Sequence, residues 1–244
     1  MIAFITSSPC IDGADRAILN PANGFLDNLR EALPEFPSCL FIASSPDRRD
    51  LTCRFGADMF IAFAEAGIPF SGYQVLDMYN AEDAAELIHS SDLIILAGGH
   101  VPTQYEFFAN LELDTLMQDY EGVVMGISAG SMNSAREVYI QPEEPGESLD
   151  PDFVRFAPGL GLTSASVCPH YQKVKHTMLD GVRLFEDITY PDSLGRSFFA
   201  MPDGSYILCA DGQEILFGEA YRIRNGILEQ ICRDGKSIDL GLLK

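Results

Sequence analysis

Ser128 is the residue in this sequence whose position most clearly suggests chemistry. It stands between two glycines in the segment Gly126-Ile127-Ser128-Ala129-Gly130, after the apolar run at 123–125 and before a stretch of helix formers. A strand, a Gly-x-Ser-x-Gly turn and a helix form a nucleophile elbow, which lifts the serine hydroxyl into solvent. The alternative is an ordinary helix N-cap, a position that serine favours. The strand-to-helix context favours the nucleophile.

A serine nucleophile needs a general base. The chain has four histidines, His89, His100, His170 and His176. His89 lies in a predicted helix and His176 in a mixed polar stretch. His170 follows a predicted strand and should reach the same edge of the sheet as Ser128, which makes it the best candidate for the base. The alternative is a histidine with a purely structural role.

The base needs an acid to hold its tautomer. The stretch at 141–164 is rich in Pro, Gly and acids, and it is long for a plain connection, which is typical of a functional loop. It offers several carboxylates between Ser128 and His170, namely Glu143, Glu144, Glu147, Asp150 and Asp152. Most of these must be solvated surface charges, and the residues alone do not choose among them.

A second glycine turn, Gly98-Gly99, ends the strand that precedes the strand of Ser128. Backbone N–H groups there could bind an oxyanion together with the N–H of Ala129. The alternative is a strand-end turn that needs a positive φ, which glycine adopts readily. His100, beside this turn, is either a loop residue or a substrate contact.

The elements that would position these residues alternate along the first half of the chain. Apolar runs predict strands at 2–6, 39–44, 73–78, 92–99 and 123–127, and helical patterns fall at 24–33, 54–67, 81–90 and 105–120. This alternation predicts a parallel sheet covered by helices on both faces. A sixth strand is predicted at 163–171.

The C-terminal part has another rhythm. Three turn pairs separate short apolar runs there, Asp203-Gly204, Asp211-Gly212 and Asn225-Gly226. Such pairs are strong hairpin signals and predict an antiparallel meander.

Length and charge narrow the function. The 244 residues suit a single α/β domain spanning 1–244, and the net charge of −20 disfavours nucleic acid and anionic membranes as partners. No apolar run approaches the ~18 residues that a membrane span needs, and the N-terminus reads as a strand, so we expect a cytoplasmic protein.

The six cysteines form no CxxC pair and are expected to be free thiols. No metal site or cofactor is predicted.

Three segments in this order, "DLIILAGGH", "GVVMGISAGS" and "CPHY", resemble the S51 serine peptidases, which include dipeptidase E and cyanophycinase. The resemblance covers roughly residues 2–225 in element order. It implies the class I glutamine amidotransferase-like fold, a flavodoxin-like α/β sandwich, with serine in place of that superfamily's cysteine. His100 stands where the family has asparagine.

Carried over residue by residue, the resemblance implies Ser128 as nucleophile and His170 as base. It places the acid about fifteen residues after the serine, at Glu143, with Glu144 as the neighbouring option. Gly99 and Ala129 would supply the oxyanion N–H groups. Selectivity for an N-terminal aspartate would need a cationic pocket, for which the basic residues Arg136, Arg155 and Lys173 are candidates.

The sequence therefore predicts a serine peptidase that cleaves short peptides, without cofactor, as a monomer or homo-oligomer. The principal alternative is a non-catalytic binding or regulatory protein that retains the fold. An α/β-hydrolase is less favoured, because that fold places its histidine late and no histidine follows His176. A glutamine amidotransferase would need cysteine at position 128.

Overall fold

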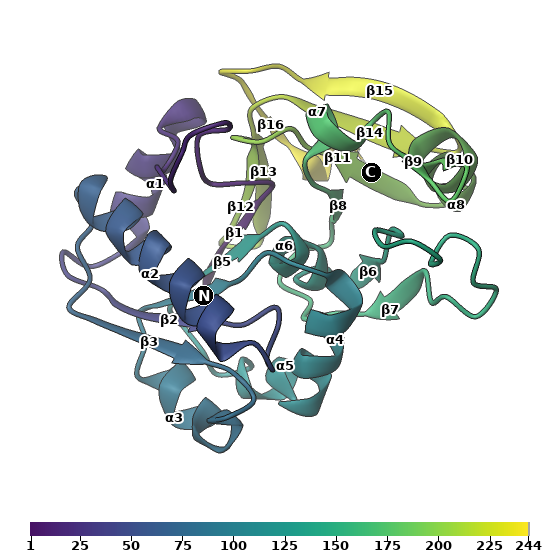
Figure 1. The fold of residues 1–244 in the computed structure, drawn as a ribbon. Helices are drawn as coiled ribbons and strands as arrows, with labels where there is room; N and C mark the ends of the chain where they lie inside the picture. Colours follow the sequence, from purple (N-terminus) through teal and green to yellow (C-terminus); the bar gives the residue numbers. More distant parts are fainter. Residues whose placement is uncertain (244) are drawn as a thin grey trace.

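A computed structural model describes residues 1–243, which form a central eight-stranded sheet with helices on both faces and a smaller sheet at one side (Figure 1). The strands of the large sheet are β1 (Ile2–Thr6), β2 (Ser38–Ile42), β3 (Gly72–Leu76), β4 (Leu93–Leu96), β5 (Val123–Ile127), β12 (Tyr206–Ala210), β13 (Gln213–Phe217) and β16 (Ser237–Asp239). Their order is β16-β13-β12-β1-β5-β4-β2-β3. The five strands from β1 to β3 in this order are parallel, whereas β12, β13 and β16 add on antiparallel.

The smaller sheet has four strands in the order β15-β14-β11-β8. They are β8 (Ser166–Cys168), β11 (Ser197–Ala200), β14 (Ala220–Arg224) and β15 (Ile227–Cys232). Strands β8 and β11 are parallel, and the other neighbours are antiparallel. Two short antiparallel pairs complete the strands, β6 (Glu137–Tyr139) with β7 (Phe156–Pro158) and β9 (Met178–Leu179) with β10 (Val182–Arg183).

The helices follow the strands in the alternation that the sequence predicts. The α-helices are α1 (Phe25–Ala32), α2 (Arg49–Glu65), α3 (Ala84–His89), α4 (Val101–Asn110), α5 (Leu113–Leu116), α6 (Ala129–Asn133), α7 (Tyr171–Val174) and α8 (Tyr190–Asp192). Short 3₁₀ helices span Ala22–Gly24, Ala81–Asp83 and Leu240–Leu243, and a π-helical turn spans Leu184–Thr189. Within residues 1–243, no helix is long and apolar enough to cross a membrane.

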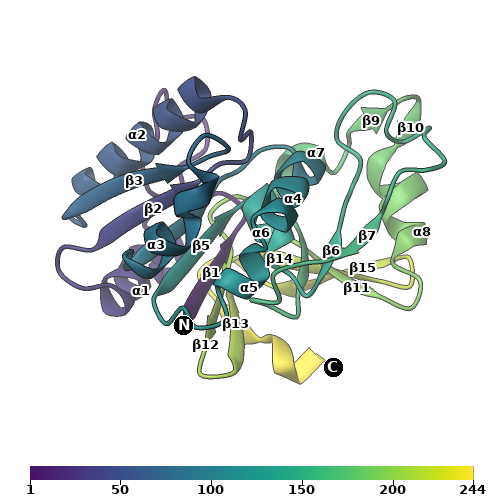
Figure 2. The ribbon, with the colours of Figure 1, turned by 90° about the horizontal axis from the view of Figure 1, so that it is seen from below.

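Side-chain alternation in the parallel strands divides the core into two layers. In β4, Ile94 and Leu96 pack with α3, α4 and α6, whereas Leu93 and Ile95 pack with α1 and α2 on the other face. A strand sends successive side chains to opposite faces, so a strand buried on both faces must be apolar throughout. All four residues of β4 are fully buried, and Figure 2 shows the sheet between its two layers of helices.

The predicted α/β fold with a mainly parallel sheet and antiparallel additions is confirmed. Two details differ. The predicted helix at 105–120 is two helices, because Glu112 adopts a left-handed φ of 50° between α4 and α5. The predicted meander is divided between the sheets: β12 and β13 extend the large sheet, and β14 and β15 belong to the small one.

The parallel strands all end at one edge of the sheet, where their carboxyl ends meet. Thr6 pairs with Ile127, and Leu96 pairs with Gly126 and Ile42. The loops after these residues therefore lie side by side. In an open α/β sheet this edge is where ligands bind.

Helix α6 packs so closely on β4 that Gly130 has no room for a side chain. A Cβ there would lie 2.3 Å from the backbone oxygen of Leu96, which cannot swing away. We expect Gly130→Ala to lower the free energy of unfolding by about 2 kcal/mol or more. Gly72→Ala is the matched control, since nothing lies within 4 Å of its Cβ position. Urea unfolding that showed equal effects for the two variants would contradict this packing.

Candidate active site

Ser128 occupies a strained turn between β5 and α6. Its φ of 50° and ψ of −108° lie outside the regions that non-glycine residues favour. The backbone N–H of Ser128 donates to the carbonyl oxygens of Thr6 at 3.2 Å and Ser7 at 3.1 Å, which ties the turn to the end of β1. The side chain makes no capping hydrogen bond to α6. The geometry therefore differs from that of an ordinary N-cap.

The two glycines of the motif are explained by close packing. A Cβ on Gly126 would lie 2.8 Å from the backbone of Ser131, and one on Gly130 would lie 2.3 Å from the oxygen of Leu96. Neither glycine has a positive φ; the residue with the positive φ is Ser128 itself. Each glycine of the Gly-x-Ser-x-Gly pattern therefore stands where the elbow packs too closely for a side chain.

His170 faces Ser128 from the end of β8. Its Nε2 lies 2.9 Å from the Oγ of Ser128. A left-handed φ of 56° turns the chain at His170 into α7, and its backbone N–H donates to the Oγ of Ser7 at 2.7 Å. The pairing that the sequence predicts between Ser128 and His170 is therefore present as a hydrogen bond.

Asp203 holds the other nitrogen of the imidazole. Its Oδ1 lies 2.6 Å from the Nδ1 of His170 and accepts a hydrogen bond from the Oγ of Ser7 at 2.9 Å. Its Oδ2 lies 2.8 Å from the Nζ of Lys173, and its side chain is only 4% exposed. With the proton of His170 on Nδ1, its Nε2 is free to accept the Ser128 proton.

The environment of Asp203 keeps it ionised. Burial by itself would raise the pKa of Asp203, but hydrogen bonds from His170 and Lys173, the charge of His170 and the hydrogen bond from Ser7 outweigh it. The net result is a pKa well below the usual range for aspartate. The pKa of Lys173 is raised, first by its hydrogen bond to Asp12 and then by its hydrogen bond to Asp203.

The acid beside His170 is thus not the one expected. Glu143, placed there by the family resemblance, lies on the loop before Gly146, where its backbone N–H donates to the Oε2 of Glu147 at 2.8 Å. In the sequence, Asp203 is recognisable only as the first residue of an Asp-Gly turn. Its approach to His170 follows from the parallel pairing of β11 with β8, which the sequence does not signal.

The Gly98-Gly99 turn lies directly against the elbow. A Cβ on Gly98 would be 3.5 Å from the Cβ of Ser128, and one on Gly99 would be 2.4 Å from the Oγ of Ser44. Neither glycine has a positive φ. Close approach to Ser44 explains Gly99, whereas a Cβ on Gly98 would make only ordinary van der Waals contacts. Ala129 is fully buried and is the first residue of α6, where a backbone N–H has no acceptor within the helix.

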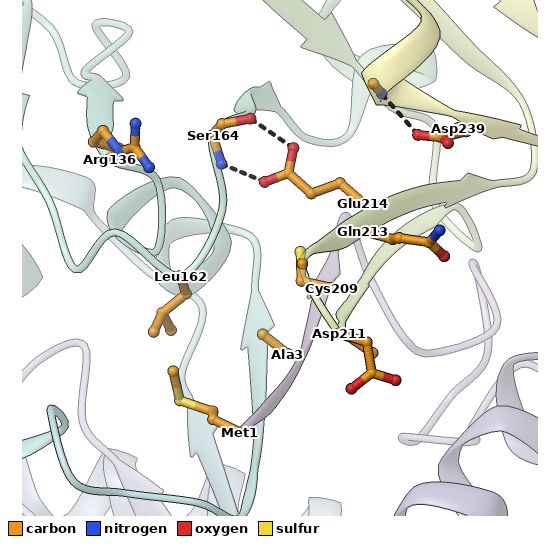
Figure 3. Close-up of a pocket in the computed structure, with 13 residues that line it drawn as sticks. Met1, Ala3, Arg136, Leu162, Ser164, Cys209, Asp211, Gln213, Glu214 and Asp239 are labelled. Carbon is orange, nitrogen blue, oxygen red and sulfur yellow. Dashed lines mark hydrogen bonds between the residues drawn. The ribbon is translucent and has the colours of Figure 1, made fainter.

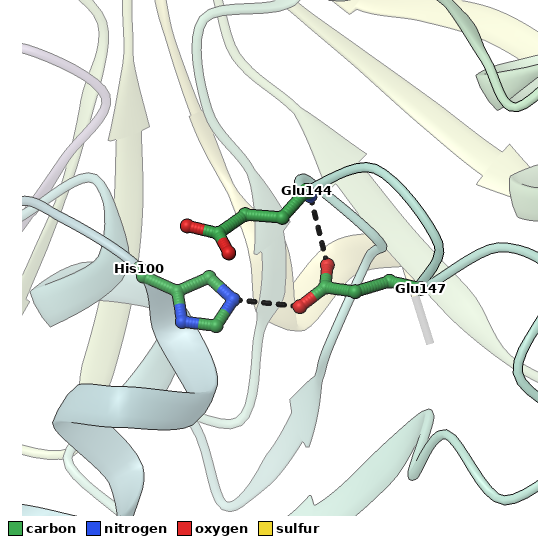
Figure 4. A group of neighbouring side chains, drawn as sticks. All are labelled: His100, Glu144 and Glu147. Carbon is green, nitrogen blue, oxygen red and sulfur yellow. Dashed lines mark hydrogen bonds and ion pairs between the residues drawn. The ribbon is translucent and has the colours of Figure 1, made fainter.

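His100, which follows the Gly98-Gly99 turn, lies beside Glu144 and Glu147 (Figure 4). The Nε2 of His100 lies 2.8 Å from the Oε1 of Glu147, and its Nδ1 lies 2.8 Å from the hydroxyl of Thr103. The Oε2 of Glu147 accepts the N–H groups of Glu143 and Glu144. These hydrogen bonds connect the loop that carries Glu143, Glu144 and Glu147 to the start of α4. They also lower the pKa of Glu147 despite its partial burial.

Among the described residues, His100, Glu144 and Glu147 are also the group whose ligand atoms lie close enough to hold a metal ion, within 4.8 Å of one another. Both nitrogens of His100 and both oxygens of Glu147 are already engaged in hydrogen bonds. The hydrogen bonds explain why these side chains meet, without an ion.

Glu143 lies on the same loop as Glu144 and Glu147. It is accessible to solvent, yet protein atoms surround it on several sides, and the resulting desolvation raises its pKa to about 7. The charges of His100 and His170 oppose the rise, and those of Glu147 and Glu144 add to it. The charge of Glu143 is therefore felt by His170, although Asp203 makes the hydrogen bond.

The three basic residues considered for an aspartate pocket do not build one. Lys173 is paired with Asp203 and Asp12, and Arg155 stacks over Phe153 with its Nη1 3.9 Å from Asp192. Arg136 follows α6 on the way to β6, away from the carboxyl ends of the parallel strands.

A serine on a strand-to-helix elbow, hydrogen-bonded to a histidine that is held by a buried aspartate, is the arrangement typical of serine hydrolases. The model of peptidase family S51 matches residues 39–216, more than half of the chain. The chain therefore belongs to peptidase family S51, a family of serine-type peptidases. A comparison with curated protein sequences found no match.

Two solved structures share the fold. The crystal structure of a peptidase from an acI-B1 Actinobacterium has a TM-score of 0.66 at 16% sequence identity, covering 98% of this chain and 96% of that one. The crystal structure of a putative peptidase E protein from Listeria monocytogenes EGD-e has a TM-score of 0.57 at 16% identity, covering 88% of this chain and 96% of that one.

The low pKa of Asp203 predicts a specific dependence of stability on pH. A carboxylate whose pKa is depressed by folding contributes stability above its unfolded pKa of about 3.9, and this contribution is lost as the pH falls towards the folded value. We expect Asp203→Asn to lower the free energy of unfolding by on the order of 2 kcal/mol near neutral pH. The difference from the wild type should shrink below about pH 4.

Urea unfolding between about pH 5.5 and pH 3 measures this difference. Asp234→Asn is the control, because Asp234 is exposed and its substitution should change stability little at any pH. A stability difference for Asp203→Asn that stayed constant over this range would show that Asp203 is not held ionised by its neighbours.

Proposed function

We propose that this protein is a serine peptidase that cleaves short peptides through Ser128, His170 and Asp203. The observation that carries the proposal is the continuous hydrogen-bonded chain from the Oγ of Ser128 through the imidazole of His170 to the carboxylate of Asp203, at 2.9 Å and 2.6 Å. A protein that retained the fold without activity would not need a serine at a strained turn to be joined to a histidine and an aspartate by hydrogen bonds. The hydrogen bond between Ser128 and His170 therefore argues against a purely non-catalytic role.

In the proposed reaction, the Oγ of Ser128 attacks the peptide carbonyl while its proton passes to the Nε2 of His170. The N–H groups of Gly99 and Ala129 stabilise the negative oxygen of the tetrahedral intermediate. Asp203 stabilises the imidazolium and keeps Nδ1 protonated. Collapse breaks the C–N bond, and the Nε2 proton goes to the departing amine. Water, activated by His170, then hydrolyses the acyl-serine and restores the free enzyme.

The charge around the site suggests which substrates fit. Glu144 lies beside His100, and Glu143 is close enough for the charges of His100 and His170 to lower its pKa. The basic residues Lys173 and Arg155 are already near carboxylates. A cationic group on the substrate would meet favourable charge there, and an anionic one would meet repulsion. We therefore propose peptides that carry a positive charge next to the scissile bond, rather than acidic ones.

Fluorophosphonate labelling measured by intact mass tests the nucleophile and decides which acid serves His170. We expect one label per wild-type chain and none for Ser128→Ala. Labelling should slow for Asp203→Asn by on the order of 10³-fold or more, because the histidine loses the partner that fixes its tautomer. Glu143→Gln should label at a rate within about tenfold of the wild type, since its charge acts on His170 only at a distance.

The reverse order, with Glu143→Gln inactive and Asp203→Asn active, would contradict the proposed triad. A folded wild type that does not label and does not cleave a dipeptide library would favour the non-catalytic alternative.

The raised pKa of Glu143 predicts how substrate preference changes with pH. Glu143 gains its charge as the pH rises through about 7, so its attraction for a cation should grow from about pH 6 to pH 8. The ratio of kcat/KM for a lysine peptide to kcat/KM for the matching methionine peptide isolates this effect, because steps common to both substrates cancel. We expect the ratio to rise by about two- to fivefold over this range.

Glu143→Gln should leave the ratio flat, while Glu82→Gln, a substitution of an exposed residue before α3, should not change its rise. A preference for aspartate over methionine in the wild type would contradict a cation-selective site.

A further inference from the structure

Arginines gather at the opposite end of the small sheet from the candidate active site. A cavity of about 380 Å³ is lined by Arg136, Arg196, Arg222 and Arg224, with Glu137 and Glu214 as its acidic members. These are four of the 16 basic residues in a chain whose net charge is −20. A local excess of positive charge on so acidic a protein favours the binding of anions at this place.

The register of the small sheet places two of these arginines side by side. Arg224 pairs with Ser197 and Arg222 with Phe199 across β14 and β11. Since the side-chain period of a strand is two, these four side chains share one face. The intervening residues Phe198 and Ile223 belong to the hydrophobic core on the other face. The core therefore fixes the direction in which Arg222 and Arg224 point.

Two of the four guanidinium groups are engaged by carboxylates. The Nε of Arg196 lies 3.0 Å from Glu137, and the Nη2 of Arg222 lies 2.9 Å from Glu229. Arg222 also donates to the backbone oxygen of Leu243 at 3.0 Å. Within residues 1–243, the side chains of Arg136 and Arg224 make neither an ion pair nor a hydrogen bond.

Glu214, the other acid that lines this cavity, is already hydrogen-bonded to other groups. Glu214 accepts hydrogen bonds from the backbone N–H of Ser164 at 2.5 Å, from the Ser164 hydroxyl at 2.6 Å and from Thr163 at 3.0 Å. Figure 3 shows Glu214 bound to Ser164 with Arg136 on the other side of Ser164, in an adjoining cavity of about 480 Å³ that all three residues line. The positive charge of Arg136 is thus available to a ligand.

We propose that this arginine pocket binds a small multivalent anion through paired carboxylate or phosphate oxygens. A guanidinium presents a planar fork of N–H donors that matches either group in bidentate fashion. Arg136 and Arg224 supply the unpaired guanidinium groups. Ser197, which pairs with Arg224 across the two strands, offers a hydroxyl. Phe199 forms an apolar floor beside them.

The pocket lies at the amino ends of the two strands that carry the candidate catalytic residues. Strand β8 begins at Ser166, which lines the pocket, and leads to His170; strand β11 begins at Ser197 and leads to Asp203. From Ser166 to His170 the chain spans about 13 Å at the usual strand rise. The lining of the pocket contains none of Ser128, His170 and Asp203, so an anion bound there occupies a separate place.

Isothermal titration with inorganic phosphate and, separately, with citrate at constant ionic strength tests the proposal. We expect saturable binding of at least one anion to the wild type and to Ser128→Ala. The double variant Arg136→Gln/Arg224→Gln should bind at least about tenfold more weakly, since each lost fork removes charge-assisted hydrogen bonds. Tighter binding of citrate would identify carboxylate as the ligand chemistry, and tighter binding of phosphate would identify phosphate.

Arg54→Gln, on the exposed face of α2, is the matched control and should bind as the wild type does. The single variant Arg224→Gln provides the same comparison if the double variant does not fold, as judged by circular dichroism. Equal binding by the wild type and the arginine variants, loss of binding in Ser128→Ala, or no saturable binding of either anion would each overturn the proposal.

Discussion

The tight contact between the elbow and its neighbours is the constraint on which the site depends. Gly126 and Gly130 bring α6 against β5 and β4 so closely that no side chain fits, and Ser128 takes the left-handed φ that results. A strained non-glycine residue costs on the order of 1–3 kcal/mol and persists only where its surroundings over-determine it. Here two hydrogen bonds from the N–H of Ser128 to the end of β1 help to hold it.

Much of this could be predicted from the sequence, because the relevant signals are local. The alternation of apolar runs with helical patterns predicts the parallel sheet, and the elbow pattern at Ser128 predicts the strand-to-helix turn. His170 follows from the expectation that parallel strands end at one edge. Each of these inferences needs only a window of a few residues and the topology of the sheet.

The acid could not be predicted in the same way, because its placement depends on the small sheet. Asp203 lies where the chain leaves β11 and enters β12, and the sequence around it signals only a turn. That β11 lies parallel to β8, and so delivers Asp203 to His170, depends on long-range pairing. Glu143 stands where the family resemblance places the acid, but Glu147 accepts its backbone N–H and in turn bonds His100, and the hydrogen bond to His170 is made by Asp203.

Ser7, near the N-terminus, connects two residues from the C-terminal part of the chain at the site. Its hydroxyl receives the N–H of His170 and donates to Asp203, and its strand, β1, lies between β5 and β12. During synthesis from the N-terminus, the elbow can form once β1, β4 and β5 have emerged, but Asp203 and β12 arrive about eighty residues later. The elbow therefore precedes both His170 and Asp203 along the chain. The hydrogen bonds that join the three side chains can form only after β12 has been made and has paired with β1.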